Sequence, residues 1–426
     1  MLGLMALLPF LLPAQIGGVL NRAKYKAQQR ADNHIDKAID KGLDAAEGKS
    51  TEPAVAKNDK PAKPVSTEAA PATAEEPSVK SYSKFDFVPG DKILYFENFD
   101  QEAIGEMPTG WNTNGSGEVV TLSNIPGKWL KISQRSTYLT NNEKEFAENY
   151  TVEFDVLMQF KNDGHFYPYF SFGLFSSKGE PAAGNEFLTN YKKNSAVEAI
   201  VYPADGAKSK VNLYSYKDGR YDFKGTDKFL ENLGENFGKP VHVAIQVQKE
   251  RFRMWVNEEK VYDVPKGVPV AYVMNQLQFQ VHSSNYKEGQ YGMFISNLKV
   301  ATGLPDTRHK LVDEGKFSTT GILFDFQSAV IKPSSYGVVK EIAQVLKDNA
   351  SLKIKVIGHT SSDGDDAANM ELSRKRSAAV KELLVSEFAI GADRIQTDGK
   401  GETQPVADNA SKEGKALNRR VEFIKQ

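Results

Sequence analysis

Hydrophobic and polar residues alternate with a period of two along most of the chain between about Ser83 and Ala301. This alternation predicts half-buried β-strands. The clearest predicted strands are 151–160, 241–248, 251–256, 260–265 and 277–283. Short turns separate several of them, and many short strands with turn signals favour a sandwich or a barrel. An outer-membrane barrel needs strands of roughly ten residues with an apolar outer band. Because most strands here are shorter and carry polar residues on their second face, a soluble β-sandwich is favoured.

The pattern changes to alternating strands and helices from about Pro305. Strands are predicted at 321–326, 352–359, 394–401 and 419–425, with helices from Pro333 through Leu346 and from Asp365 to about Ser386. On the second helix Leu372, Arg376, Ala379 and Leu383 recur at helical spacing, which predicts an apolar row that contains Arg376. A guanidinium group in such a row requires an anion.

The first residues carry an apolar run, 2–13, that is too short to span a bilayer, since spanning takes roughly 20 residues. Its length suits the hydrophobic part of a secretory signal peptide, predicted as residues 1–14 with cleavage near Ala14 or Gln15. No Lys or Arg precedes the run, which is atypical for a signal. The alternative is a short buried helix.

Two further segments precede the strand-rich region. Residues 15–47 are predicted to contain a helix, either a solvated one or a docking helix for a partner, because Ile35, Ile39 and Leu43 recur every four residues. Residues 48–82 are predicted to be a disordered spacer rich in Ala and Pro. A segment of this composition cannot bury enough apolar surface to offset its chain entropy.

Composition excludes several classes of function. The 426 residues suffice for two or three domains. Lys and Arg number 54 and Asp and Glu 55, a balance that argues against a general nucleic-acid binder. The absence of cysteine excludes disulfides, thiolate metal sites, a cysteine nucleophile and a lipid-modified N-terminal cysteine. Six scattered histidines without a His-x-x-x-His pair argue against a zinc enzyme, so no metal or cofactor is expected.

The strand-rich region, 83–301, resembles the concanavalin A-like, laminin-G-type jelly roll. The resemblance rests on FENFDQEAIGEMPTGW at 96–111, on VHVAIQVQKERFRMWVNEEKVYDVP at 241–265 and on GMFISNLKVA at 292–301. It implies a β jelly-roll sandwich over these residues.

The C-terminal residues, 320–426, resemble the outer-membrane protein A C-terminal family, which includes peptidoglycan-associated lipoproteins. The blocks that carry the resemblance occur in order: FDFQSAVIKP (324–333), GHTSSDG (358–364), NMELSRKRSAAV (369–380), GKGETQPVADN (399–409) and NRRVEF (418–423). The resemblance implies an α/β domain of βαβαββ order that binds the peptide stem of peptidoglycan, with meso-diaminopimelate as the principal ligand. Residues 302–319 are then a linker.

The free end of diaminopimelate is a zwitterion, so its receptor needs a fixed cation and an anion or several carbonyl groups. Arg376 is the predicted cation, since a guanidinium fork matches a carboxylate through two hydrogen bonds. The alternative for Arg376 is an internal ion pair. Asn369 matches the family's asparagine near the helix start, where a hydrogen bond at the helix start is an equal alternative.

One position departs from the family. The family usually has Asp directly after Gly-His-Thr, and here Thr360 is followed by Ser361. Asp363, two residues on, is the acid that can replace it, and capping of the following helix is its alternative role. Gln327 stands where the family often has Asn. Arg419 and Arg420 match the family's paired arginines, of which one is expected to brace the fold through an ion pair.

Catalysis in the strand-rich region has little support. Glu153-x-Asp155 is similar to part of the motif of some jelly-roll glycosidases, but Met158 and Gln159 stand where the later Glu would be. The aromatic run 165–175 can line a sugar groove, although it is more typical of core and sheet surface.

The features together predict a non-enzymatic envelope protein of a Gram-negative bacterium, located in the periplasm and associated with the outer membrane and cell wall. Peptidoglycan is the predicted partner of the C-terminal domain. An outer-membrane protein or complex is the predicted partner of the sandwich. The alternative is a jelly-roll lectin or glycan-acting enzyme that the C-terminal domain anchors to the wall.

Overall fold

The computed structural model describes residues 85–162, 164–303 and 306–426. The predicted signal peptide, N-terminal helix and spacer, residues 1–82, lie outside the described residues. Two large hydrophobic cores organise the described chain, one built from residues 95–300 and one from residues 311–423. We call residues 85–303 the β domain and residues 306–426 the C-terminal domain.

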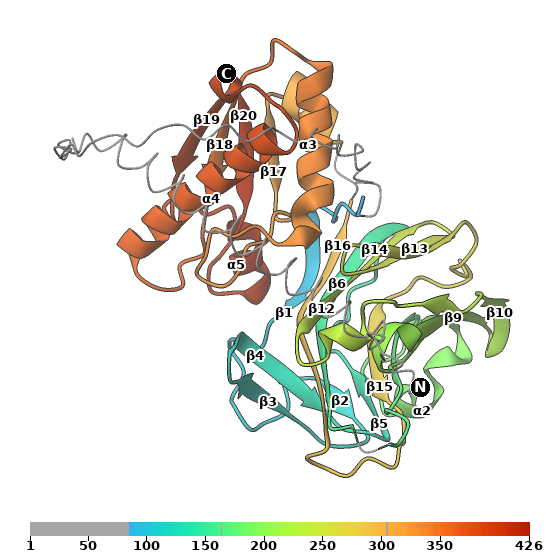
Figure 1. Cartoon of the computed structure of the whole chain (residues 1–426). Helices are drawn as coiled ribbons and strands as arrows, with labels where there is room; N and C mark the ends of the chain where they lie inside the picture. The colour runs from blue at the N-terminus through green and yellow to red at the C-terminus, as the bar shows by residue number, and fades with distance from the viewer. Residues whose placement is uncertain (1–84, 163, 304–305) are drawn as a thin grey trace, which may run out of the picture. The chain divides into compact units, whose positions relative to one another are not determined.

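The β domain contains two eight-stranded antiparallel sheets (Figure 1). In the first sheet the order is β14-β13-β12-β6-β16-β4-β3, and β1 also pairs with β16. Its strands are β1 (Lys92–Glu97), β3 (Gly117–Leu122), β4 (Ile125–Ile132), β6 (Asn149–Phe160), β12 (Pro240–Gln248), β13 (Arg251–Val256), β14 (Glu259–Val264) and β16 (Tyr291–Thr302).

The second sheet has the order β10-β9-β8-β7-β15-β5-β2, and β11 also pairs with β9. Its strands are β2 (Asn112–Thr113), β5 (Ser136–Leu139), β7 (Phe170–Phe175), β8 (Ser195–Tyr202), β9 (Lys210–Lys217), β10 (Arg220–Lys224), β11 (Lys228–Phe229) and β15 (Gln276–Val281). Short helical turns complete the domain: α2 (Phe187–Asn190), η1 (Tyr191–Lys193), η2 (Gly206–Lys208) and η3 (Gly234–Asn236).

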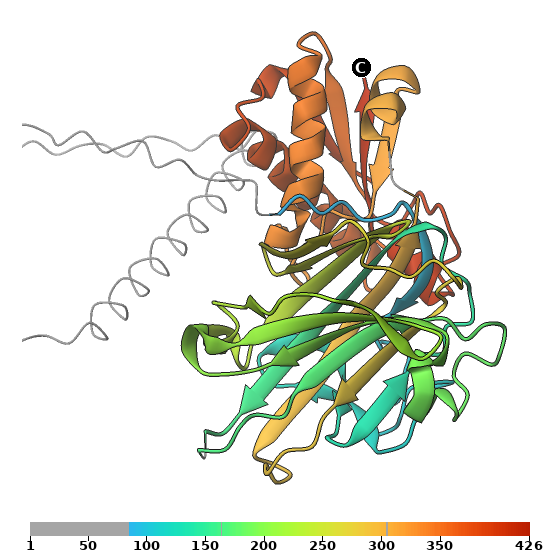
Figure 2. The same cartoon turned by 90° about the vertical axis from the view of Figure 1, so that its right-hand side faces the viewer.

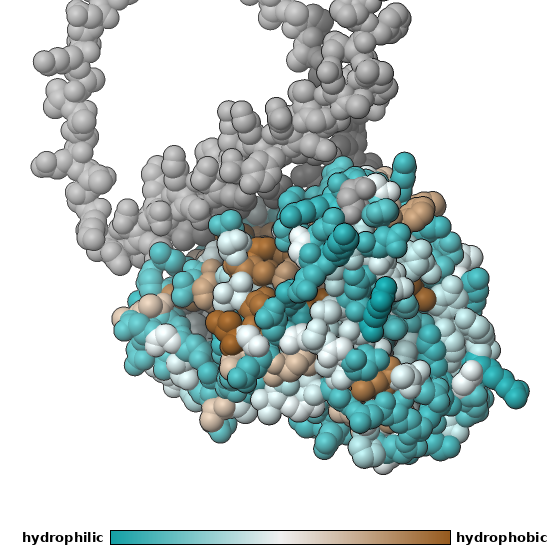
Figure 3. Space-filling model, turned by 90° about the horizontal axis from the view of Figure 1, so that it is seen from below, coloured by the Kyte–Doolittle hydropathy of each residue, from teal (hydrophilic) through white to brown (hydrophobic). Residues whose placement is uncertain are grey.

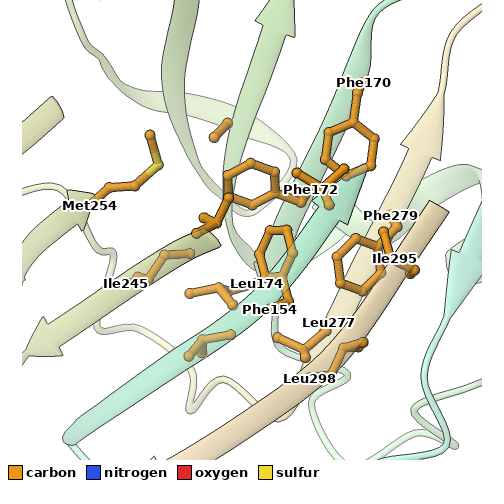
Figure 4. Packing of buried hydrophobic residues seen from close by; sticks show 14 of the residues in the cluster. Phe154, Phe170, Phe172, Leu174, Ile245, Met254, Leu277, Phe279, Ile295 and Leu298 are labelled. Atoms are coloured by element: carbon orange, nitrogen blue, oxygen red, sulfur yellow. The ribbon is translucent and has the colours of Figure 1, made fainter. Parts of the chain in front are cut away.

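Side chains from both sheets meet in one core, as Figure 4 shows. Phe154 of β6 lies between Phe172 of β7 and Phe279 of β15, with ring centroids 4.9 and 5.2 Å apart and edge-to-face geometry. Such aromatic pairs stabilise a core beyond the area they bury. The five alternating segments predicted from the sequence coincide with β6, β12, β13, β14 and β15.

The aromatic run 165–175 is divided between core and surface. Phe170, Phe172 and Leu174 are buried in the shared core, whereas Phe166 is 90% exposed and Tyr169 is 40% exposed. All three tryptophans of the chain are buried.

The Glu153-x-Asp155 pair of β6 belongs to a buried cluster of charges. Glu153 Oε1 lies 2.7 Å from Lys299 Nζ, and Asp155 accepts hydrogen bonds of 2.7 Å from His242 Nδ1 and from Asn297 Nδ2. His242 Nε2 lies 3.5 Å from the second oxygen of Glu153. These contacts occupy both carboxylates, which are about 95% buried, so the pair presents no acid and base to a substrate.

The buried cluster predicts a loss of stability in mild alkali. Burial alone would lower the pKa of His242, but hydrogen bonds and charges of Asp155 and Glu153 raise it from 6.5 to about 9. The folded state therefore binds a proton that the unfolded chain releases near pH 6.5, and this stabilisation is complete below pH 6.5. We expect the free energy of unfolding of the β domain to fall as the pH rises from about 6.5 through about 9, measured by urea unfolding at each pH. A His242→Gln variant that shows the same pH dependence would contradict this assignment.

The C-terminal domain is built on a four-stranded sheet of order β17-β20-β18-β19, in which only β18 and β19 are parallel. Figures 1 and 2 show α3 and α4 on one face of this sheet. The strands are β17 (Lys316–Thr319), β18 (Ile354–Gly358), β19 (Ile395–Gly399) and β20 (Val421–Lys425). The helices are α3 (Tyr336–Asp348), α4 (Asp366–Ser386) and α5 (Lys412–Asn418), with shorter turns η4 (His309–Asp313), η5 (Pro333–Ser335) and η6 (Ala392–Arg394).

The first strand of this domain differs from the prediction. Residues 321–326 form only a single bridge, between Phe324 and Ile331, and the edge strand is β17 instead. The predicted linker, 302–319, is correspondingly wrong, because β16 extends to Thr302 and β17 already belongs to the sheet. Phe317 explains the difference, since its buried ring stacks 6.2 Å from that of Phe423 on β20 and fixes the pairing.

The buried face of α4 also differs from the predicted apolar row. Its deepest positions include Ser373, Ser377, Val380 and Leu384, whereas Leu372 and Arg376 are half-buried at the edge. The hydroxyl of each serine donates a hydrogen bond to the carbonyl oxygen three residues earlier in the helix. Both serines can therefore be buried without leaving a hydroxyl group unsatisfied. The sheet admits this face because Gly358 lacks a side chain: a Cβ there would lie 2.2 Å from the Ser373 carbonyl oxygen.

Hydrophilic residues predominate on the face of the molecule drawn in Figure 3, and hydrophobic residues form separate patches there. Within the part of the chain that the structure describes, none of the helices combines the length and the hydrophobicity needed to cross a membrane.

Candidate functional site

Arg376 lies on α4 beside the loop that connects Phe324 and Ile331. Its Nε donates a 3.0 Å hydrogen bond to the carbonyl oxygen of Ser328, and its guanidinium carbon lies 4.8 Å from the centre of the Phe324 ring. Burial lowers the pKa of Arg376 to about 10, with a further contribution from the charge of Arg419, so the group stays protonated at neutral pH. No carboxylate of the described residues forms a salt bridge with it, and the internal ion pair considered as its alternative role is not formed with them.

The two consecutive arginines before β20 have different roles. Arg420 forms a salt bridge with Glu422, donating from Nη2 at 2.8 Å and from Nε at 2.9 Å, so it is the arginine that braces the fold. Burial alone would raise the pKa of Glu422, but its close contacts with His359, Lys316 and Arg420 hold it far below its ordinary value. Arg419 instead points toward the loop after β18, with Nη1 3.4 Å from Ser361 Oγ and 3.7 Å from Asp363 Oδ2.

Asp363 is the acid of this loop and is held by its neighbours. Ser361 Oγ donates to it at 3.0 Å, and Lys415 Nζ of α5 lies 2.6 Å from its other oxygen. Burial alone would raise the pKa of Asp363, but the hydrogen bonds from Lys415 and Ser361 lower it. Capping of α4, the alternative role for Asp363, is performed by Asp365, which accepts from the backbone N–H of Ala368 at 2.9 Å.

Asn369 makes the hydrogen bonds at the helix start that its alternative role predicted. Its Nδ2 donates to the carbonyl oxygen of Asp363 at 3.1 Å and to Glu402 Oε2 at 2.7 Å. Asn369 therefore ties the first turn of α4 to the loop that carries Ser361 and Asp363.

Thr360 and Gln327 lie at the margins of the site. The Thr360 hydroxyl is buried without a hydrogen-bond partner among the described residues, while its backbone N–H donates to Gly401 at 2.9 Å. Gln327 is exposed and has a φ of 51°, in the left-handed region that Asn tolerates better than Gln. Its neighbour Ser328 provides the carbonyl group that holds Arg376.

The structure thus connects three of the predicted site residues, Ser361, Asp363 and Asn369, through hydrogen bonds. Arg419 contacts Ser361 and Asp363, and Thr360 precedes Ser361 in the same loop. Arg376 contacts a different loop, through Ser328 and Phe324, and the positive charge of Arg419 contributes to lowering its pKa. Sequence reasoning missed Lys415, Glu402 and Phe324. The helix that carries Lys415 has a recognisable start, since Ser411 accepts from the backbone N–H of Gly414.

The arrangement offers groups of both charges to a zwitterionic ligand. Arg376 provides an unpaired guanidinium suited to a carboxylate, and Asp363 provides a carboxylate suited to an ammonium group. Among the described residues, no group of three or more His, Asp or Glu side chains is placed to hold a metal ion.

The residues of this site lie in a part of the chain that is similar to known proteins. Residues 323–419 match the model of the OmpA family. Outer membrane porin F of Pseudomonas aeruginosa is 45% identical over 101 residues, which cover 24% of this chain and 29% of the porin. Peptidoglycan-binding protein ArfA of Mycobacterium bovis is 35% identical over 103 residues, which cover 24% of this chain and 31% of that protein.

Among solved structures, the peptidoglycan-associated lipoprotein from Burkholderia pseudomallei is 28% identical, with a TM-score of 0.24, and the match covers 26% of this chain and 89% of that one. The chain spans less than a third of the length of the two sequence relatives named above. Its C-terminal domain is OmpA-like, as the ordered motifs predicted, and this domain follows a sheet-rich region in a multidomain chain.

Proposed function

We propose that the C-terminal domain binds the diaminopimelate-containing peptide stem of peptidoglycan and thereby holds the protein at the cell wall. The observation that carries this proposal is Arg376, a half-buried guanidinium group that forms no salt bridge with a carboxylate of the described residues. Leaving a partly desolvated cation without a counter-ion costs free energy, part of which a ligand carboxylate would recover. One relative, ArfA of Mycobacterium bovis, is named as a peptidoglycan-binding protein, which agrees with this chemistry.

In this proposal the ligand's carboxylate pairs with Arg376, with Arg419 nearby to add positive charge. The ligand's ammonium group pairs with Asp363, which takes the role of the acid that Ser361 lacks. Asn369, Ser361 and Thr360 hold the loop in place, and Gln327 shapes the turn next to Ser328.

The rest of the chain has a supporting role in this proposal. The β domain is a jelly-roll sandwich of the concanavalin A type over residues 83–301, and it contacts an outer-membrane protein or complex. Residues 1–14 are removed as a signal peptide, and residues 15–47 and 48–82 serve as helix and spacer. The protein then acts without catalysis in the periplasm of a Gram-negative bacterium, near the outer membrane.

Sedimentation tests the proposed function directly. The full-length protein should co-sediment with purified peptidoglycan of the diaminopimelate type, and free stem peptide should release it into the supernatant. Protein that stays in the supernatant under low-salt and physiological-salt conditions would refute the proposal.

The role of Asp363 gives a separate prediction. Asp363→Asn keeps the size of the side chain and removes its charge, so we expect binding of a diaminopimelate-containing peptide to weaken roughly tenfold or more, as loss of one charged hydrogen bond implies. Calorimetric titration measures the affinity, and thermal melting reports any loss of stability from the broken contact with Lys415. Ser361→Asp in the same background should restore part of the affinity. Unchanged affinity in Asp363→Asn would end this assignment and leave carbonyl groups or water to bind the ammonium.

A further inference from the structure

The β domain touches the C-terminal domain at the helix that supports the proposed site. Lys412, the first residue of α5, places its Nζ 2.7 Å from Glu97 and 2.6 Å from Glu102, two carboxylates of the β domain that are 1% and 9% exposed. Figure 1 shows β1 passing beside α5. Because such buried pairs cannot separate without leaving charges unpaired, α5 is anchored to the β domain.

The same helix reaches the site at its other side. Lys415, one turn after Lys412, contacts Asp363 at 2.6 Å. Arg419 directly follows α5, and its guanidinium carbon lies 5.4 Å from the centre of the Phe96 ring on β1. Arg419 is therefore placed between an aromatic ring of the β domain and the acid of the site.

This contact has the geometry of a cation–π interaction, in which a guanidinium group lies within about 6 Å of a ring centre. An arginine side chain has several rotatable bonds, so it loses conformational entropy when a ligand orders it. A ring that already holds the guanidinium in place lowers that cost, since the side chain is ordered before the ligand arrives.

We propose that Phe96 of the β domain is a positioning residue of the stem-peptide site, which holds Arg419 ready for the ligand's carboxylate. Lys412 fixes α5 so that Lys415 and Arg419 keep this arrangement. The affinity of the C-terminal domain for an acidic ligand then depends on the β domain. This inference rests on the proposed function.

The test uses the full-length protein and two stem peptides that differ only in whether the terminal carboxylate of diaminopimelate is free or amidated. Phe96→Leu removes the ring and keeps most of the apolar volume. We expect it to weaken binding of the free-acid peptide by about two- to fivefold, the contribution of a cation–π contact at a partly exposed site. Binding of the amidated peptide should change less, so the preference for the free acid shrinks.

Two controls separate positioning from packing. Phe96→Tyr retains the ring and should bind both peptides as the wild type does. Ile104→Ala alters a residue of the β domain that is 60% exposed and should change neither affinity. Thermal melting identifies any variant that is unfolded, and Phe96→Met replaces Phe96→Leu if the latter melts at assay temperature.

Two outcomes separate this inference from the proposed function. If the wild type binds neither peptide, the proposed function itself fails. If the wild type prefers the free acid and Phe96→Leu shows the same affinity and the same preference, Phe96 has no positioning role.

Discussion

Replacing Arg376 by alanine is expected to abolish co-sedimentation of the full-length protein with diaminopimelate-type peptidoglycan. Hydrogen bonds to charged groups contribute about 1.5–3 kcal/mol, so losing this cation should weaken binding by roughly ten- to a hundredfold or more. The fold should survive, because Arg376 forms no salt bridge within the described residues and its side chain donates one hydrogen bond there, to the carbonyl oxygen of Ser328. Arg376→Lys should bind with intermediate affinity, since lysine keeps the charge without the two-pronged geometry.

Arg374 provides the matched control for this substitution. It lies on the same helix, two residues earlier, and its side chain is exposed. Arg374→Ala removes the same charge from the protein and should leave sedimentation unchanged. If Arg376→Ala sediments as well as Arg374→Ala, then Arg376 does not bind the wall.

Replacing Lys299 by methionine is expected to destabilise the β domain by about 3–5 kcal/mol, the usual cost of removing one partner from a buried ion pair. Lys299 is 6% exposed and faces Glu153 at 2.7 Å, in the cluster that also contains Asp155 and His242. Without Lys299, the two buried carboxylates share one cation, His242. Urea unfolding followed by fluorescence of the buried tryptophans measures the change.

Lys131→Met is the control for Lys299→Met. Lys131 pairs with Glu118 at a similar distance, 2.8 Å, but both side chains are more than a third exposed, at 34% and 42%. Pairs of this kind contribute about 1 kcal/mol or less. Equal losses of stability in the two variants would contradict the view that the cluster around Glu153 is a desolvated network.

The sequence was sufficient to predict elements whose pattern is local. Alternation along 241–248 and 251–256 identified β12 and β13, because one face of each strand enters the core. The start of α4 was equally visible, since Asp365 is a favoured helix-capping residue.

Elements that depend on contacts distant in sequence were not predictable in this way. β17 has only four residues and gains its place through pairing with β20, at the other end of the domain. The buried face of α4 contains serines because Gly358 and Gly399 let the helix approach the sheet closely. The hydropathy pattern of the helix cannot predict such a close approach.

The site shows the same division. The motifs assigned Arg376, Asn369 and Asp363 to one domain. The contact between Lys415 of α5 and Asp363 was not predictable from them, because the tertiary fold brings these two residues together. The pattern also suggested an apolar row around Arg376, whereas the structure puts it at the edge of α4, where a guanidinium can face a ligand.

The central claim is that Arg376 binds the carboxylate of a diaminopimelate stem peptide. Calorimetric titration of the free-acid and the amidated peptide into wild-type protein and into Arg376→Ala tests it most directly. We predict that the wild type binds the free acid at least about tenfold more tightly than the amide, the equivalent of one charged hydrogen bond. In Arg376→Ala this preference should largely disappear. Equal affinities of the wild type for the two peptides, or an undiminished preference in Arg376→Ala, would contradict the claim.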